Sequence, residues 1–306
     1  MTQRFFSGRE SWVFRADALE ELCGHHPDLV GQVLSAGEPL EYLLYSPLRE
    51  VDAGPFGLKG PSGSHALAVT RDRLIVSRDP HQPGRSRTVC QVPFASILTV
   101  ELGEALTLGW FVVRFAAAGQ LASETVFFQS SGIEHFRGAV RAWRASGIAT
   151  ADSRRYAEGW DGICAQSPPY VRNQLAPLIL EGERPQAVLH VDETWYPAAG
   201  RRTTCASAAG VCAVTDRALL LVQSERPYQP DALVFAVNAT CLDRRVLRNI
   251  TLARNESPSS ELLTMALDIQ VESVGLQVKM PVGRPAAGAL EGFLAEARRA
   301  GGAQSC

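Results

Sequence analysis

The chain has 306 residues, a formal net charge of −2 and a hydrophobic content of 46%, which is the composition of a globular protein of about two domains. A nearly neutral charge argues against a nucleic-acid binder driven by bulk electrostatics, so we expect no nucleic-acid partner. No run of about 18 apolar residues occurs, and Met1–Phe6 lacks the apolar core of a signal peptide. We therefore expect a cytoplasmic protein with no transmembrane segment. Its seven scattered cysteines then indicate free thiols.

The first half of the chain predicts a short helical arm over residues 1–25 and a helix over Pro27–Ala36 that ends at Gly37. Strands separated by turns and a loop rich in glycine and proline follow. The predicted strands are Leu40–Tyr45, Ala66–Thr70, Arg73–Ser77, Val89–Val92, Ile97–Leu102, Phe111–Phe115 and Val126–Gln129. An amphipathic helix that begins at Ile133 and ends at Gly147 closes this half.

The chain repeats itself at an offset of 145 residues. Gly37-Glu38 matches Gly182-Glu183, and Ala68–Thr70 matches Ala213–Thr215. We expect this register to hold from Leu29 to Ile97 without a gap. The matches fall in apolar runs and at the turn between them, where a duplicated fold needs them.

The second copy predicts the same elements. Val171–Glu181 predicts a helix shortened or kinked by Pro177, and Pro185–Val191 predicts the first strand. The closing helices of the two copies match at an offset of 154, as Gly147 and Gly301 do, which predicts a nine-residue insertion at Ala253–Glu261.

About seven antiparallel strands and one closing helix in each copy predict an α+β fold of two tandem small barrels. The predicted boundaries are an N-terminal arm at 1–25, a first domain at 26–148, a linker at 149–170 and a second domain at 171–302.

Two segments of the first copy resemble the pleckstrin-homology-like domains of bacteria and the related GRAM domains. They are the hairpin Ala66–Val76 and the Pro-aromatic pattern of Val92–Ile97. The second copy keeps Ala213–Arg217 but has Asn238 where the repeat places Pro93. The resemblance implies a small barrel of about seven strands, capped by the C-terminal helix, in each copy.

The resemblance also implies recognition, so we predict a non-catalytic tandem module that binds a protein or peptide partner and needs no cofactor. Trp195 and Tyr196, at a strand end before a loop, are candidate anchors for that partner. One alternative is peripheral targeting to the inner membrane face through anionic lipid head groups. The resemblance implies basic ligands on the first loop and its neighbouring strand, which are Lys59, Arg71 and Arg73 with Arg201, Arg202 and Arg217 in the second copy.

A second alternative is an enzyme with a site at the domain junction, built around Cys164, His26 or His190. No constellation of such residues repeats or clusters in the sequence. Cys23, His25 and His26 lie close together, but zinc needs four ligands and no partner pair is visible, so we expect no metal site.

Overall fold

The structure is a computed structural model of the chain. It describes residues 11–47, 63–80, 86–146, 159–197, 203–227, 229, 234–243, 246–254, 262–283 and 287–302.

The chain divides into two compact units whose segments alternate along the sequence. The first unit contains Met1–Ile97, Glu104–Val113 and Ser123–Ala149, and the second contains Leu98–Gly103, Arg114–Ala122 and Thr150–Cys306. The domain boundaries predicted from the repeat stay a prediction.

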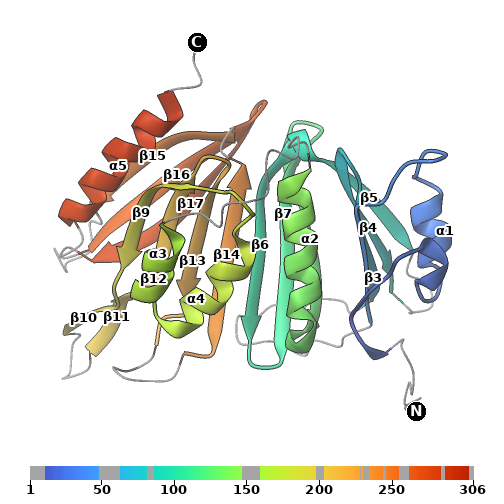
Figure 1. Cartoon of the computed structure of the whole chain (residues 1–306), viewed down its shortest axis with the longest axis horizontal. Helices are drawn as coiled ribbons and strands as arrows, with labels where there is room; N and C mark the ends of the chain where they lie inside the picture. The colour runs from blue at the N-terminus through green and yellow to red at the C-terminus, as the bar shows by residue number, and fades with distance from the viewer. Residues whose placement is uncertain are drawn as a thin grey trace. The chain divides into compact units, whose positions relative to one another are not determined.

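The first unit begins with a five-stranded antiparallel sheet in the order β1-β2-β3-β4-β5, of which β3, β4 and β5 are labelled in Figure 1. A strand covered on one face alternates apolar and polar residues, and a strand covered on both faces is apolar throughout. β3 is buried at every position. The strands are β1 (Phe14–Arg15), β2 (Tyr42–Ser46), β3 (Ser64–Val69), β4 (Arg73–Asp79) and β5 (Thr88–Pro93).

The predicted helical arm is wrong for the described residues 11–25. They contain β1 and the 3-10 turn η2 (Leu19–Glu21) and no α-helix. Phe14 and Arg15 pair with Tyr45 and Leu44, because the open edge of β2 satisfies their main chain better than an isolated short helix does. The next helix, α1 (His26–Gly31), is shorter than predicted and packs on β3 and β4.

The closing part of the first copy consists of β6 (Ile97–Ala105), β7 (Leu108–Ala117), β8 (Gln120–Gln129) and α2 (Ile133–Ala145). Within the first unit, the ring of Phe128 stacks on that of Phe136 in α2, with 3.8 Å between centroids. A Cβ at Gly109 would collide with the Phe128 ring, so the ring occupies the space that the glycine leaves. α2 packs on β2 and β3.

The second copy repeats the order of a helix, antiparallel strands and a closing helix, and it contains further elements besides. Its helices are α3 (Trp160–Gln166), α4 (Pro169–Leu175) and α5 (Ala287–Gly302), and the 3-10 turn η5 (Ala176–Leu178) contains Pro177. Its strands are β9 (Pro185–Val191), β10 (Thr194–Pro197), β11 (Thr203–Ser207), β12 (Gly210–Thr215), β13 (Ala218–Ser224), β14 (Ala236–Asp243), β15 (Leu247–Arg254), β16 (Leu262–Val271) and β17 (Val274–Gly283).

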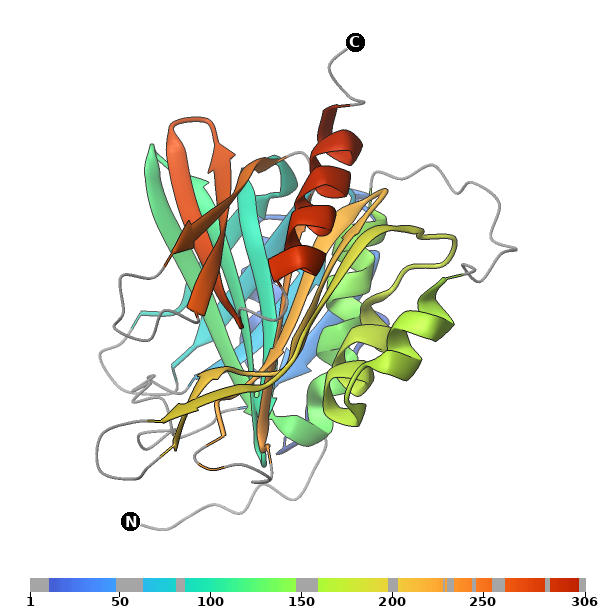
Figure 2. The same ribbon diagram turned by 90° about the vertical axis from the view of Figure 1, so that its left-hand side faces the viewer.

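Two helices cover the strands of the second unit. In the sheet order β6-β14-β13-β12-β9, the second unit's Leu98–Gly103 supplies the β6 neighbour of β14. α4 packs on β13 and β14, and α5 packs against β9 (Figure 2). One apolar core contains side chains from both ends of this unit, including Leu98, Leu189, Met265 and Phe293.

The strand registers confirm the 145-residue offset for the first strands and correct it afterwards. Ala68 pairs with Ile75, and Ala213 pairs with Leu220, at the same offset on both strands. However, Leu74 pairs with Val92, whereas Leu219 pairs with Leu242.

The offset is therefore 150 at β5 and β14, and it becomes 154 at β7 and β16, which start at Leu108 and Leu262. The ungapped alignment through Ile97 is wrong, and the nine extra residues are divided between two connections. Five lie between β13 and β14 and four between β15 and β16.

The prediction of an α+β fold is confirmed. The structure consists mostly of antiparallel sheets with few helices, and in the described part of the chain the sheets do not close into a barrel. The predicted first strand of the second copy, Pro185–Val191, has the bounds of β9. The helix before it is shortened at Pro177 as predicted.

Candidate functional site

Both repeats place a glutamate directly after a left-handed glycine, at the point where a helical segment leads into the first strand. Gly37 has a φ of 76° and Gly182 a φ of 71°, a backbone conformation that glycine adopts without steric cost. The turn aims Glu38 and Glu183 back at the helix end and at the hairpin between the next two strands.

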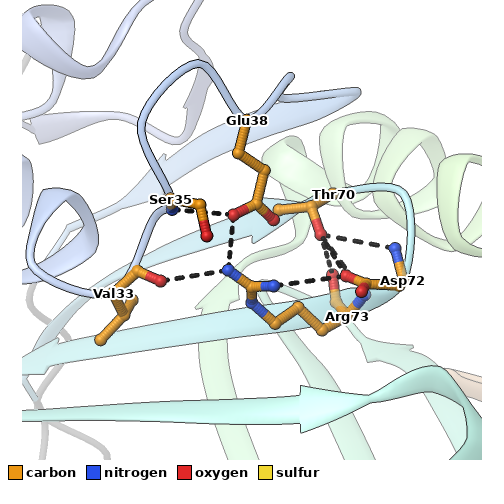
Figure 3. A network of polar contacts seen from close by, with 6 residues as sticks. All are labelled: Val33, Ser35, Glu38, Thr70, Asp72 and Arg73. Atoms are coloured by element: carbon orange, nitrogen blue, oxygen red, sulfur yellow. Dashed lines mark hydrogen bonds and ion pairs between the residues drawn. The ribbon is translucent and has the colours of Figure 1, made fainter.

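In the first unit, Glu38 is the centre of a polar network (Figure 3). Its carboxylate accepts a hydrogen bond from the N–H of Ser35 at 2.9 Å and forms an ion pair with the Arg73 guanidinium at 2.6 Å. Arg73 also donates to the carbonyl of Val33 at 3.1 Å. The guanidinium therefore connects the end of the α1 region to the β3–β4 hairpin.

The hairpin itself is closed by Thr70. Its hydroxyl oxygen accepts hydrogen bonds from the N–H groups of Asp72 and Arg73, at 3.5 and 3.4 Å. The Asp72 carboxylate lies 3.4 Å from Arg73 and is mostly exposed. This is the side-chain-to-backbone pattern by which threonine stabilises a turn.

The charges of this network set the protonation of Glu38. Burial acts to raise the pKa of Glu38, but the hydrogen bonds from Ser35 and Thr70 and the charge of Arg73 outweigh it, and the pKa falls below its usual range. Glu38 is therefore a carboxylate that already has its donors and its cation.

The second unit repeats the threonine and the glutamate without the arginine. Thr215 donates to Glu183 at 2.6 Å, and the N–H of Leu180 donates to the other carboxylate oxygen at 2.9 Å. At the 145-residue offset, Ala218 stands where the first copy has Arg73. The shared pair thus stabilises the turn in both copies, and the ion pair belongs to the first copy.

Of the six basic residues predicted to bind an anionic head group, the structure describes three. Arg71 is exposed, Arg217 is half-buried, and the side chain of Arg73 is 18% exposed and occupied by Glu38 and Val33. The other three candidates, Lys59, Arg201 and Arg202, lie outside the described residues.

Strand β5 gives the first unit an open sheet edge. β5 is the last strand in the order β1-β2-β3-β4-β5, and no described strand lies on its other side. The N–H of Phe94, just beyond β5, donates to the carbonyl of Asp72 at 2.8 Å. Because antiparallel pairs alternate, Val92, Cys90 and Thr88 also direct their main-chain groups toward β4.

The main-chain N–H and C=O groups of Val89 and Gln91 consequently point away from the sheet. Gln91 is exposed and Val89 half-buried. No charged residue occurs from Thr88 to Val92, although charged side chains are a common means of blocking an open edge. In the second unit the equivalent strand, β14, has a strand on each side, β13 and β6.

A buried polar trio, His26, Ser64 and Ser77, lies where α1 packs on β3 and β4 of this sheet. Nδ1 of His26 lies 2.8 Å from the Ser77 hydroxyl, and Nε2 lies 2.9 Å from the Ser64 hydroxyl. All three side chains are at most 1% exposed. A neutral imidazole donates through one nitrogen and accepts through the other, so it satisfies one serine in each direction.

The second copy has no such trio. At the 145-residue offset, His26, Ser64 and Ser77 become Val171, Ala209 and Val222, which are also buried. The same packing position is therefore polar in one copy and apolar in the other. Sequence reasoning considered His26 only as a metal ligand or catalytic base and missed its serines, although the aligned copies contain the signal.

Burial shifts the pKa of two residues considered as catalytic candidates, Cys164 and His190, toward their neutral forms. Burial raises the pKa of the Cys164 thiol, which lowers the fraction of reactive thiolate at neutral pH. Burial also lowers the pKa of His190. Among the described residues, no group of three or more histidine, cysteine, aspartate or glutamate side chains could hold a metal ion.

The aromatic candidates lie on β10, which pairs with β11. Trp195 is half-buried, and its indole N–H donates to the carboxylate of Glu193. Tyr196 pairs with Thr204 through the main chain, and its side chain lies outside the described part of the structure.

Comparison with protein-family models and with curated proteins finds no match to this chain. Among the described residues, none of the helices combines the length and the apolar character needed to cross a membrane.

Proposed function

We propose that this protein is a non-catalytic tandem pleckstrin-homology-like module that recognises a partner protein. It does so by accepting an extended segment of that partner along β5. The observation that carries the proposal is the open edge formed by Val89 and Gln91, whose outward main-chain groups have no strand beside them among the described residues.

The order of elements supports the pleckstrin-homology-like part of the proposal. In each copy a first group of antiparallel strands is followed by three more strands and then by one helix. These are β6, β7, β8 and α2 in the first copy and β15, β16, β17 and α5 in the second. The equal registers of β3 with β4 and of β12 with β13 support a duplicated unit.

Two features favour an extended peptide over an anionic lipid head group as the ligand. A phosphate would have to compete with Glu38 for the guanidinium of Arg73, at a separation of 2.6 Å. The β5 edge offers two donors and two acceptors spaced two residues apart, which is the spacing that a peptide strand requires.

The test is a selection from a phage-displayed library of random extended peptides with the intact protein. Selected peptides should protect the amides of Val89 and Gln91 from hydrogen exchange. Gln91→Pro removes one outward donor without touching the pairing with β4, and it should weaken their binding at least tenfold. Gln91→Ala keeps the donor and should bind as the original protein does.

Peptides that bind Gln91→Pro as tightly as the original protein would overturn the proposal, because they would use another surface. Flotation with anionic vesicles tests the lipid alternative. Salt-sensitive flotation lost in Arg71→Glu and unaffected by Gln91→Pro would favour the membrane function instead.

A further inference from the structure

The β5 edge can pair with a second copy of itself, because Thr88–Val92 carries no charge that a copy would repel. The strand reads Thr-Val-Cys-Gln-Val from Thr88 to Val92 and carries no charge. Its outward-facing residues, Val89 and Gln91, are placed symmetrically about Cys90. A second β5 running antiparallel therefore presents acceptors to donors and donors to acceptors at both positions.

We infer that the strand accepted by β5 is β5 of a second copy of this chain, so that two copies join their sheets edge to edge about a two-fold axis at Cys90. The inference rests on the proposed function, since it names the partner of the same edge. It is an isologous contact, which closes on itself and gives a dimer.

The register of this dimer follows from the alternation of the strand. Val89 of each copy exchanges two main-chain hydrogen bonds with Gln91 of the other, because the outward groups belong to these residues. Cys90 then faces its own equivalent in a non-hydrogen-bonded pair, where Cα atoms are about 4.5 Å apart. Pro93 lacks an N–H and ends the pairing on both sides.

The second unit shows which kind of element this position accepts. β14, the equivalent of β5 at an offset of 150, is followed in its sheet by a further strand, β6. The edge of β5 lacks the lysine and the internal proline with which unpaired edges are usually blocked. Both observations favour a strand over a helix or a lipid surface as the occupant.

The test combines the mass of the intact protein in solution with cross-linking at Cys90. Light scattering behind size exclusion should show a dimer that dissociates on dilution. A short bismaleimide at pH 8.5 should join Cys90 to Cys90, as identified by mass spectrometry of the linked peptides. Burial raises the pKa of Cys90 to about 11, so the raised pH increases the small fraction of reactive thiolate.

Two edge variants separate self-pairing from a general loss of folding. Gln91→Pro removes two hydrogen bonds per dimer, and Gln91→Lys keeps them but brings two like charges within reach across the pair. Each should weaken the dimer at least tenfold, whereas Gln91→Ala should leave it unchanged. Far-ultraviolet circular dichroism checks that the variants stay folded.

A folded monomer at the highest concentration tested would overturn the inference, and so would a dimer that survives both edge variants or cross-links only through another cysteine. Such results leave the proposed function standing if library peptides still bind the edge in a Gln91-dependent manner. Peptide binding that fails while the Cys90 dimer forms would instead remove foreign peptides as partners.

Discussion

The buried trio of the first unit predicts a strongly non-additive set of substitutions. His26→Val leaves the hydroxyls of Ser64 and Ser77, both at most 1% exposed, without their imidazole partner. Leaving a buried hydroxyl short of one hydrogen-bond partner costs at most about 1–3 kcal/mol, so the two serines set an upper range of about 2–6 kcal/mol of unfolding free energy for the single variant. The serines' other contacts place the result toward the lower end of that range.

The combined variant His26→Val/Ser64→Ala/Ser77→Val copies the apolar residues of the second unit. Replacing all members of a buried polar network by well-packed apolar groups is often nearly neutral. The triple variant should therefore lie within about 1.5 kcal/mol of the original protein. It should be more stable than His26→Val alone, although it carries two more substitutions.

Urea unfolding followed by circular dichroism measures the free energies, and hydrogen exchange at the amides of β3 assigns the change to the first unit. Val222→Ser is the matched control, because it places a hydroxyl at the equivalent position without an imidazole. It should destabilise the second unit. A triple variant whose loss equals the sum of three single losses would refute the reasoning, because the serines would then not depend on His26.

Three further predictions concern single positions in the first unit. Glu38→Gln replaces a half-buried ion pair by a neutral hydrogen bond to Arg73 and should cost about 1–2 kcal/mol in urea unfolding, less at high salt; an unchanged midpoint would contradict this. Gly109→Ala should cost about 1–3 kcal/mol and lower the melting temperature, since its Cβ collides with the Phe128 ring. For His65, burial together with the charge of Arg78 lowers the pKa to about 3, so the folded state stays neutral while the unfolded chain gains a proton below pH 6.5. Stability should be complete above pH 6.5 and fall by up to about 1.4 kcal/mol per pH unit toward pH 3, and His65→Gln should flatten this decline in urea midpoints measured from pH 7 to 4.5.

The helix stop at Gly37 and the turn after Thr70 could be predicted from the sequence, because these parts of the network recur in both copies. Gly37, Glu38 and Thr70 recur at 145 residues, and the structure shows that the glycine conformation and the threonine–glutamate pair account for this identity. The ion pair could not be predicted in the same way. Arg73 has no counterpart in the second copy, and its distance from Glu38 in the sequence is bridged only by folding.

The change of the repeat offset from 145 to 150 residues after β4 could not be predicted from the sequence, for a different reason. At the offset of 145, Val89 and Val92 align with Val234 and Val237. This match is a coincidence, because valine is common in strands. An insertion in a connection cannot be recognised in the sequence when apolar residues still coincide at the original offset of 145. Only the main-chain pairing of Leu219 with Leu242 shows that the second copy has five more residues at this connection.

The segment Leu98–Gly103 belongs to the second unit, together with Arg114–Ala122 and Thr150–Cys306. Leu98 belongs to the apolar core of the second unit, and the carbonyl of Leu102 accepts a hydrogen bond from the buried side chain of Gln174. A fragment that begins at residue 150 would therefore lose Leu98 from its apolar core and the carbonyl of Leu102 to which Gln174 donates. Cutting the chain between its two repeats would therefore not give two independently folding halves. The second compact unit includes segments of the first repeat, so the boundaries of the repeats and of the units differ.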